Sequence, residues 1–162
     1  MLSVAVQAQS FRSDIDNFEV QLPETLYPLT LQYEERTALG PVQVKNISFH
    51  SNVGKFLIDV VDYPATDQRS PTQRMDGKLA QLMQNLYLEL EQVEHFLSES
   101  SPGLMIKSHN GIADEILGMF VIGQREYHIR SESFDSENTV LVLQQTEDLI
   151  RSFHIATPQV GE

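Results

Sequence analysis

The stretch Phe56-Leu57-Ile58-Asp59-Val60-Val61 is apolar at odd and even positions alike, with Asp59 as the single interruption. Successive residues of a strand point to opposite faces of a sheet, so a strand that is apolar at both parities is covered on both sides. We therefore expect residues 56–61 to form the central strand of a sheet that carries other elements on both faces.

The chain before this stretch also has the pattern of strands. Apolar and polar residues alternate over residues 18–22 and 29–33, which predicts two strands with one face in water. Gly40-Pro41 marks a turn between the second of these and the next strand.

The apolar positions of that next strand change parity along its length. Val42 and Val44 share one parity, whereas Ile47 and Phe49 share the other. An extra residue in one strand re-aims the side chains that follow it, so this change predicts a β-bulge near Lys45-Asn46.

A helix start follows the central strand. Ser70, Pro71 and Gln73 match a capping box with proline at the first helical position. Apolar residues then recur at helical spacing, which predicts one long helix that ends before the serine-rich segment 98–103. The residues on this stripe are Leu79, Leu82, Met83, Leu86, Leu90, Val93 and Leu97.

Three short strands and a second helix complete the pattern. Strands are predicted over residues 104–107, 112–121 and 125–133, with turns at Asn110-Gly111 and Gly123. Helical spacing returns at Val142, Leu143, Thr146, Leu149, Ile150 and Phe153, behind the cap candidates Asp135 and Ser136. The β-branched Val140 and Val142 leave a strand start open as the alternative.

These elements together define the expected fold class. Strands, a long helix, a β-meander and a closing helix predict an α+β domain with an antiparallel sheet and helices on both faces. We expect a flexible N-terminus or signal remnant over residues 1–10, one domain over residues 11–156, and a C-terminal tail over residues 157–162. The small-residue pattern that ends at Ala8 leaves open whether the first eight residues are the remnant of a signal peptide.

Composition restricts the classes of partner. The 162 residues include 11 basic and 23 acidic side chains, which give a net charge of −12, and no cysteine. Nucleic-acid binding needs a basic surface, so it is not expected. No stretch is long and apolar enough to predict a membrane span. We expect a soluble protein, cytoplasmic or exported to a periplasm or lumen, with a basic protein or a divalent cation as conceivable partners.

Several short motifs resemble the superfamily of the PsbP-type extrinsic proteins of photosystem II, the Ran-binding Mog proteins and small lipoprotein-like bacterial proteins. The similar residues are Phe18-Glu19-Val20-Gln21-Leu22-Pro23, Asp62-Tyr63-Pro64, the segment from Gly111 through Arg125-Glu126-Tyr127-His128-Ile129, and Phe153 after Arg151-Ser152. The resemblance covers Phe11 to Ile155 and implies an α/β/α sandwich. It implies no chemistry and no site residue, because members of the superfamily mostly bind and stabilise partners. Some relatives are chaperones of secreted effectors.

The predicted long helix carries the candidate metal and partner sites. Glu91 and His95 are four residues apart, with Glu94 between them, and on a helix such a pair can face one cation. The alternative is a solvated acidic helix face, which the composition favours. Glu89, Glu91, Glu94 and Glu99 crowd the C-terminal half, where the helix dipole disfavours negative charge, so this patch is a candidate docking site for a basic partner.

Two further groups of charged residues lie on predicted strands. Glu126, His128, Arg130 and Glu132 share one parity, which predicts either a wet strand face with cross-strand ion pairs or a polar recognition face. Asp59 and Asp62 are three residues apart in a strand, so they are expected to point to opposite faces, with Asp62 at the strand end.

No motif of nucleophilic, metal or phosphate-transfer catalysis is present. None of the five histidines has zinc-hydrolase spacing, no Gly-x-Ser-x-Gly elbow occurs, and Val53-Gly54-Lys55 lacks the rest of a phosphate loop. We therefore expect no cofactor and a non-enzymatic accessory or binding protein that acts through protein contacts. A chaperone that holds an effector segment is the first alternative. A small-molecule enzyme whose site is assembled from distant residues is the second.

Overall fold

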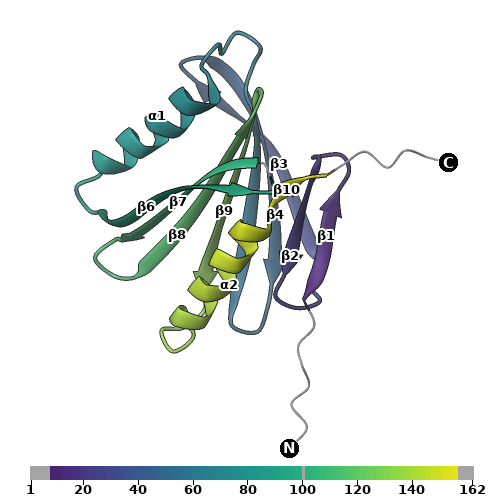
Figure 1. The fold of residues 1–162 in the computed structure, drawn as a ribbon, viewed down its shortest axis with the longest axis vertical. Helices are drawn as coiled ribbons and strands as arrows, with labels where there is room; N and C mark the ends of the chain where they lie inside the picture. Colours follow the sequence, from purple (N-terminus) through teal and green to yellow (C-terminus); the bar gives the residue numbers. More distant parts are fainter. Residues whose placement is uncertain (1–7, 100, 157–162) are drawn as a thin grey trace, which may run out of the picture.

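A computed structural model describes residues 8–99 and 101–156, which form two antiparallel sheets and two helices (Figure 1). In chain order the elements are β1 (Gln9–Ser13), β2 (Phe18–Leu22), β3 (Pro28–Thr37), β4 (Gly40–His50), β5 (Gly54–Asp62), α1 (Pro71–Met83), β6 (Glu89–Ser98), β7 (Ser101–His109), β8 (Asp114–Ile122), β9 (Arg125–Ser133), α2 (Thr139–Ser152) and β10 (His154–Ile155).

The large sheet has seven strands in the order β3-β4-β5-β9-β8-β7-β6, and all of its neighbours are antiparallel. The strand expected to be central, β5, is interior, although β9 holds the middle position. Ile58 on one face of β5 and Leu57 on the other are both buried, as the apolar pattern predicts. The expected α+β class is confirmed.

The α2 helix and the small sheet, ordered β1-β2-β10, cover one face of the large sheet side by side (Figure 1). Phe18 of β2 and Phe153 after α2 meet Phe120 and Tyr127 of the large sheet, with the Phe120 and Phe153 rings stacked 4.1 Å apart. This aromatic cluster is the centre of the main core.

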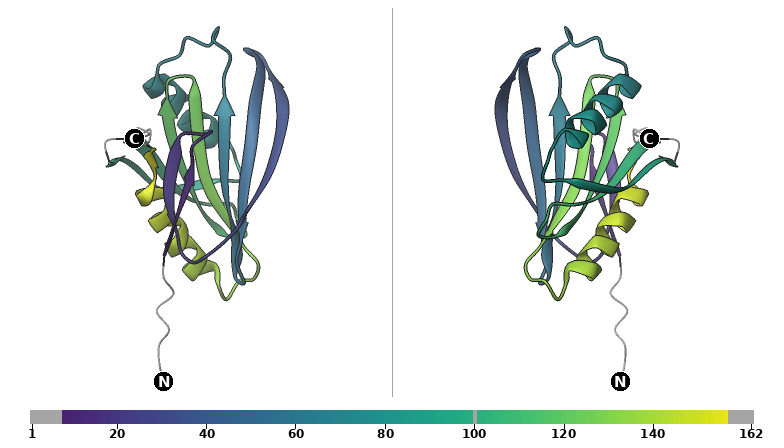
Figure 2. Two further views of the ribbon diagram at one scale, coloured as in Figure 1. Left: turned by 90° about the vertical axis from the view of Figure 1, so that its right-hand side faces the viewer. Right: turned by 90° about the vertical axis from the view of Figure 1, so that its left-hand side faces the viewer.

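The α1 helix lies on the opposite face, where it packs mainly on β8. Adjacent residues of β8 show the two sides: Gly118 faces Ile150 of α2, whereas Met119 belongs to a smaller cluster that contains Met75 of α1. The two views of Figure 2 show that α1 and α2 approach the sheet from different sides. Helices therefore cover both faces, although α1 covers only part of its own.

The start of α1 is confirmed. The Ser70 hydroxyl accepts a hydrogen bond from the Gln73 backbone N–H (3.2 Å), and the Gln73 side chain accepts one from the Ser70 N–H (2.8 Å). Its predicted length is wrong, because α1 ends at Met83 and the residues from Glu89 to Ser98 form strand β6.

Asn85 and a β-bulge explain this error. The Asn85 side chain accepts a hydrogen bond from the Tyr87 N–H (3.0 Å) and closes a turn that ends the helix. The bulge in β6 lies between Leu90 and Gln92, so Leu90 and Val93 fall on the same face at a spacing of three. A bulged strand can thus place apolar residues at the same spacing as one face of a helix.

The β-bulge predicted at Lys45-Asn46 is wrong. The register of β4 with both of its neighbours runs through these residues without interruption. The parity changes because Val44 packs with Val61 on the α1 face, whereas Ile47 and Phe49 join the main core on the α2 face.

The closing helix is confirmed as α2. It follows Asn138, whose backbone N–H donates to the side chain of the expected cap residue Asp135 (2.9 Å). The first strand begins at Gln9, two residues before the expected domain start. The expected signal remnant and C-terminal tail lie almost entirely outside the described residues. Within the described part of the chain, no helix is long and apolar enough to cross a membrane.

Candidate functional site

The row of charged residues on β9 lies on the α1 face of the sheet, as its parity predicts. Glu126, His128, Arg130 and Glu132 alternate with buried residues of the main core such as Tyr127 and Ile129. The row is less exposed to solvent than an uncovered strand face, because Glu126 is buried and His128 is mostly covered. The two ends of the row differ in their partners.

At the inner end, Glu126 belongs to a buried ion network. One carboxylate oxygen lies 3.0 Å from His128 Nε2, and the other lies 3.8 Å from Arg74 Nη1. Arg74, on the first turn of α1, also lies 3.4 Å from Asp67 and donates to the Gln124 side chain (2.7 Å). The network therefore ties α1 to the sheet.

The Arg74 guanidinium is completely buried, and Nε and Nη1 make no hydrogen bond within the described residues. It lies over the Tyr63 ring, 4.6 Å from the centroid. Hydrogen bonds from Arg69 lower the pKa of Asp67 to about 2, and burial raises the pKa of Tyr63. The arrangement keeps Asp67 ionised beside the buried cation.

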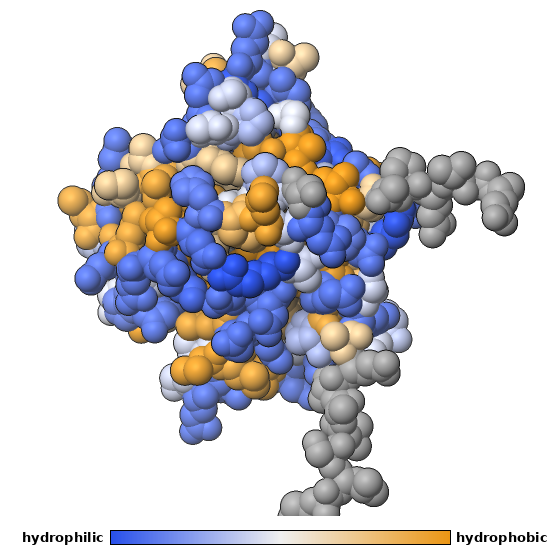
Figure 3. All heavy atoms as spheres, in the orientation of Figure 1, coloured by the Kyte–Doolittle hydropathy of each residue, from blue (hydrophilic) through white to orange (hydrophobic). Residues whose placement is uncertain are grey.

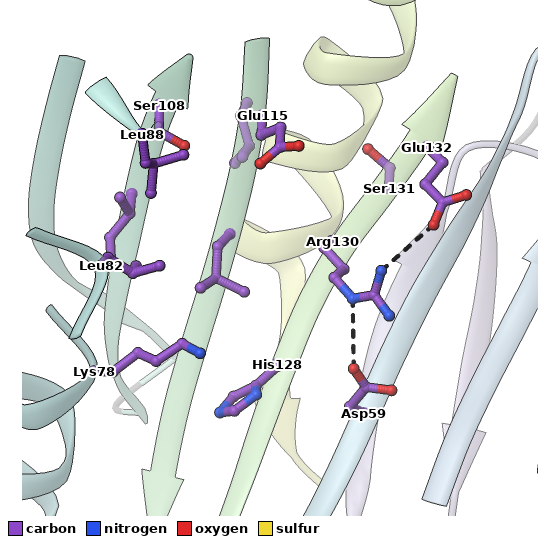
Figure 4. Close-up of a pocket in the computed structure, with 13 residues that line it drawn as sticks. Asp59, Lys78, Leu82, Leu88, Ser108, Glu115, His128, Arg130, Ser131 and Glu132 are labelled. Carbon is purple, nitrogen blue, oxygen red and sulfur yellow. Dashed lines mark ion pairs between the residues drawn. The ribbon is translucent and has the colours of Figure 1, made fainter. Parts of the chain in front are cut away.

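At the outer end, Asp59 of β5 and Arg130 of β9 are neighbours. Asp59 accepts a hydrogen bond from Asn46 (2.5 Å) and lies 3.5 Å from Arg130 (Figure 4). Arg130 reaches Glu132 at 3.5 Å, and Glu132 pairs with Lys55 at 2.8 Å. The predicted cross-strand ion pairs are present.

A hollow of about 350 Å³ lies between these residues and α1. Lys78 and Leu82 of α1 and Leu88 after it form one wall, while β7, β8 and β9 supply the floor (Figure 4). The lining residues are Asp59, Lys78, Leu82, Leu88, Ile106, Ser108, Glu115, Ile116, Leu117, His128, Arg130, Ser131 and Glu132.

The edge strand β3 continues the same face beyond β4. All ten of its residues are exposed, and Leu29, Leu31 and Tyr33 point to the α1 side because they pair with Ser48, Asn46 and Val44. We name the surface formed by Leu29, Leu31, Tyr33, Asn46, Asp59 and Arg130 the open face, because α1 lies over β8 and leaves it uncovered.

Other apolar side chains are exposed at the turn from α1 to β6. Met83, Leu86 and Tyr87 are exposed there, and Figure 3 shows apolar surface gathered around the end of α1. Met83 and Leu86 were expected to belong to a helical stripe, but Leu86 is almost fully exposed because the helix has already ended.

The proposed acidic patch lies on and after β6 rather than on a helix. Glu94 pairs with Arg151 at 2.9 Å, which lowers the pKa of Glu94, and Glu99 lies 3.5 Å from His154. Glu89 and Glu91 are exposed. Because two of the four carboxylates already have internal partners, the patch is a weaker attractor for a basic partner than its sequence indicates.

The metal site suggested for Glu91 and His95 depended on a helix that is absent. Residues four apart in a strand are separated by about 13 Å, whereas residues four apart on a helix are separated by about 6 Å. Among the described residues, no group of three or more His, Asp or Glu side chains is placed to hold a metal ion. The helical chelation geometry was therefore wrong.

Asp59 and Asp62 point to opposite faces, as expected. Asp62 ends β5 and receives two hydrogen bonds from Arg125, at 2.6 and 2.8 Å, on the α2 side. This pairing raises the pKa of Arg125, and Asp62 is thereby a structural carboxylate. The pair forms no joint acid–base site.

Sequence reasoning missed Arg74, Lys78 and the exposed stripe of β3. Arg74 and Lys78 are four residues apart on the predicted helix, on the side of its apolar stripe, and a cation in such a position is a usable signal. The alternation over residues 29–33 predicted that the apolar face of β3 is buried, because an alternating pattern does not show which strand lies at the edge of a sheet.

These features define a class of protein: an antiparallel α+β sandwich in which one face of the large sheet is buried and the other is polar and partly exposed. No protein-family model and no curated protein matches the sequence. The fold is PsbP-like: the chain is similar to the solution structure of cyanobacterial PsbP (CyanoP) from Synechocystis sp. PCC 6803, with a TM-score of 0.54 and 13% identity over 95% of each chain. At this identity the likeness concerns the fold alone.

Proposed function

We propose that this protein is a non-enzymatic accessory protein that binds a protein partner through the open face. The observation that carries the proposal is the exposed strand β3, which turns Leu29, Leu31 and Tyr33 onto the same face as Asp59 and Arg130. Contiguous exposed apolar side chains rimmed by charges are typical of protein interfaces.

A binding role fits the chemistry of this face better than catalysis. Asp59, Arg130 and Glu132 are engaged with one another or with Asn46 and Lys55, so they act as a preorganised polar rim. The PsbP-like fold supports an accessory role by analogy of fold. The net charge of −12 favours a partner with a basic surface through long-range attraction.

The test uses two variants of the same strand with the same new side chain. Leu31→Lys places a charge in the apolar stripe, whereas Thr30→Lys, the matched control, places it on the opposite face of β3. A partner recovered from the native source with the wild-type protein should bind Leu31→Lys at least tenfold more weakly in calorimetry, because a central apolar contact is lost. Thr30→Lys should bind nearly as well as the wild type. Equal binding by Leu31→Lys contradicts the proposal.

The edge of β3 also supports the second candidate, a chaperone of an effector segment. The outer side of a ten-residue edge strand carries backbone groups that can pair with an added extended segment. The two roles differ in the form of the partner that the protein binds. A chaperone should bind the isolated effector segment as tightly as the intact partner, whereas an accessory protein should require the folded partner.

A further inference from the structure

The hollow between α1 and the sheet is lined by groups of both charges, and their pairing decides what it can bind. Each carboxylate in the lining already has a partner. Asp59 is held by Asn46 and Arg130, Glu132 by Lys55 and Arg130, and Glu115 by the Asn110 amide at 2.6 Å.

Among the charged groups of the lining, the ammonium group of Lys78 is the one without a partner in the described part of the chain. It has no hydrogen-bond or ion-pair partner in residues 8–99 and 101–156. Of the eleven lysines and arginines, Arg36 on the exposed hairpin is the only other one without a carboxylate within 4.0 Å in this part of the chain. With 23 acidic residues in the chain, an unpaired cation in a half-covered position is an unusual feature.

The position of Lys78 directs its charge into the hollow. Its side chain is partly buried on the inner side of α1, and it extends toward His128 on the floor (Figure 4). His128 uses Nε2 for Glu126, so that side of the ring is occupied by the buried network. The Lys78 end of the hollow therefore offers positive charge without a counter-ion.

Apart from the paired polar groups, the lining is made of aliphatic side chains. Leu82 and Leu88 form one wall, and Ile106 and Leu117 of the sheet also belong to the lining. A volume of about 350 Å³ is at the small end of the range of ligand sites. A ligand that satisfies Lys78 and fills this space has one anionic group and a short apolar chain.

We propose that the hollow binds a small aliphatic monocarboxylate, with the carboxylate at Lys78 and the chain between Leu82, Leu88 and Leu117. The hollow adjoins the open face, because Asp59 and Arg130 belong to both, but neither Lys78 nor Leu82 belongs to that surface. Substitutions at Lys78 therefore test the hollow, and substitutions at Leu31 test the open face.

The test uses hexanoate, butyrate, acetate, hexylammonium and inorganic phosphate as probes, followed by amide chemical shifts of the full chain. Hexanoate should bind with a Kd on the order of 1 mM and shift the amides of α1, β8 and β9. Affinity should rise from acetate to hexanoate by up to about fourfold per methylene, because the chain leaves water. Phosphate should bind more weakly than hexanoate.

Variants identify the anion contact. Lys78→Met keeps the length of the apolar stem and should weaken hexanoate at least tenfold, whereas Arg36→Met, which removes the other unpaired cation, should leave the affinity unchanged. Amide spectra of both variants check that they fold. Equal affinity for acetate and hexanoate, preference for hexylammonium or phosphate, or unchanged binding by Lys78→Met would each overturn the proposal. Absence of hexanoate shifts at millimolar concentrations also overturns it.

Discussion

The face of the large sheet under α2 and the face under α1 are made by the same strands with different chemistry. Under α2, Phe18, Phe120, Tyr127 and Phe153 form contiguous ring contacts, and the small sheet closes the side that α2 leaves free. Under α1, the apolar cluster is smaller, and charged residues occupy the middle of the face.

The two faces therefore contribute differently to the stability of the fold. Apolar burial and ring packing stabilise the fold without requiring partners outside the core. A charged row that is already paired within the protein contributes less to stability, because desolvation offsets most of the attraction. One face therefore holds the domain together, whereas the other leaves apolar and charged side chains exposed. Substitutions on the two faces should therefore separate stability from binding.

The largest expected effect is on the α2 face. Phe153→Ala removes a ring that contacts three other aromatic rings and should lower the free energy of unfolding by about 4 kcal/mol, measured by urea titration. Phe134→Ala, a half-exposed control, should cost less than about 1 kcal/mol. Similar losses for both would show that the aromatic cluster is not the main source of stability.

The ion network under α1 should give the next largest effect. Asp67→Ala leaves the buried Arg74 with a more distant carboxylate as its only counter-charge and should cost about 3 kcal/mol. Asp76→Ala, on the exposed side of the same helix, is the control and should change stability by less than about 0.5 kcal/mol. Arg74→Met should cost at least as much, because it removes the buried cation from both Asp67 and the buried Glu126. An Arg74→Met variant as stable as the wild type would contradict this account.

The pH dependence of stability gives an independent test of Asp67. Because its pKa is lowered from 3.8 to about 2 in the folded protein, its ionisation stabilises the fold above the unfolded pKa, and this contribution disappears as the pH falls toward 2. The pKa difference corresponds to about 2 kcal/mol. The difference in unfolding free energy between the wild type and Asp67→Asn should therefore shrink between pH 4 and pH 2. A difference that is constant across this range would exclude the ion pair as its cause.

A pair of glycines offers a sharper contrast between the faces. A Cβ atom at Gly118 would lie 2.6 Å from the Ile150 side chain of α2, so Gly118→Ala should cost about 2 kcal/mol, with partial recovery in the Ile150→Ala background. Gly77 in α1 has nothing within 4 Å of such an atom, and Gly77→Ala should stabilise the helix by about 0.5 kcal/mol or more. The sign of the two effects is read from thermal unfolding. A loss for both glycines would indicate that α1 is as closely packed as α2.

The elements with local signals could be predicted from the sequence. The capping box at Ser70 fixed the start of α1, and β9 was predicted with the bounds that it has, because Arg125 follows a glycine turn and the alternation of 126–132 is uninterrupted. The row on β9 was likewise assigned to one face. These features depend on residues close together in the chain.

The errors arose where distant contacts decide the outcome. The spacing of Leu90 and Val93 is compatible with a helix, and only pairing with β7 makes it a bulged strand. The parity change in β4 reflects two different clusters on its two faces, which no local pattern encodes. The hollow and the open face are similarly assembled from α1 and from strands far apart in the chain, so the sequence could not reveal them.

The smallest expected effect on stability belongs to the open face, and it is the most direct test of the division. Leu31 is 64% exposed, so Leu31→Lys removes little buried area and should change the free energy of unfolding by less than about 0.5 kcal/mol. Val60→Lys, at a buried position of β5, should unfold the protein, because it places an unpaired charge in the main core. Urea titration compares the variants with the wild type. If Leu31→Lys lost more than about 1.5 kcal/mol, β3 would be part of the stabilising core, since an exposed apolar side chain has no such energy to lose. A stable Leu31→Lys that no longer binds the partner is the result that assigns stability and recognition to different faces.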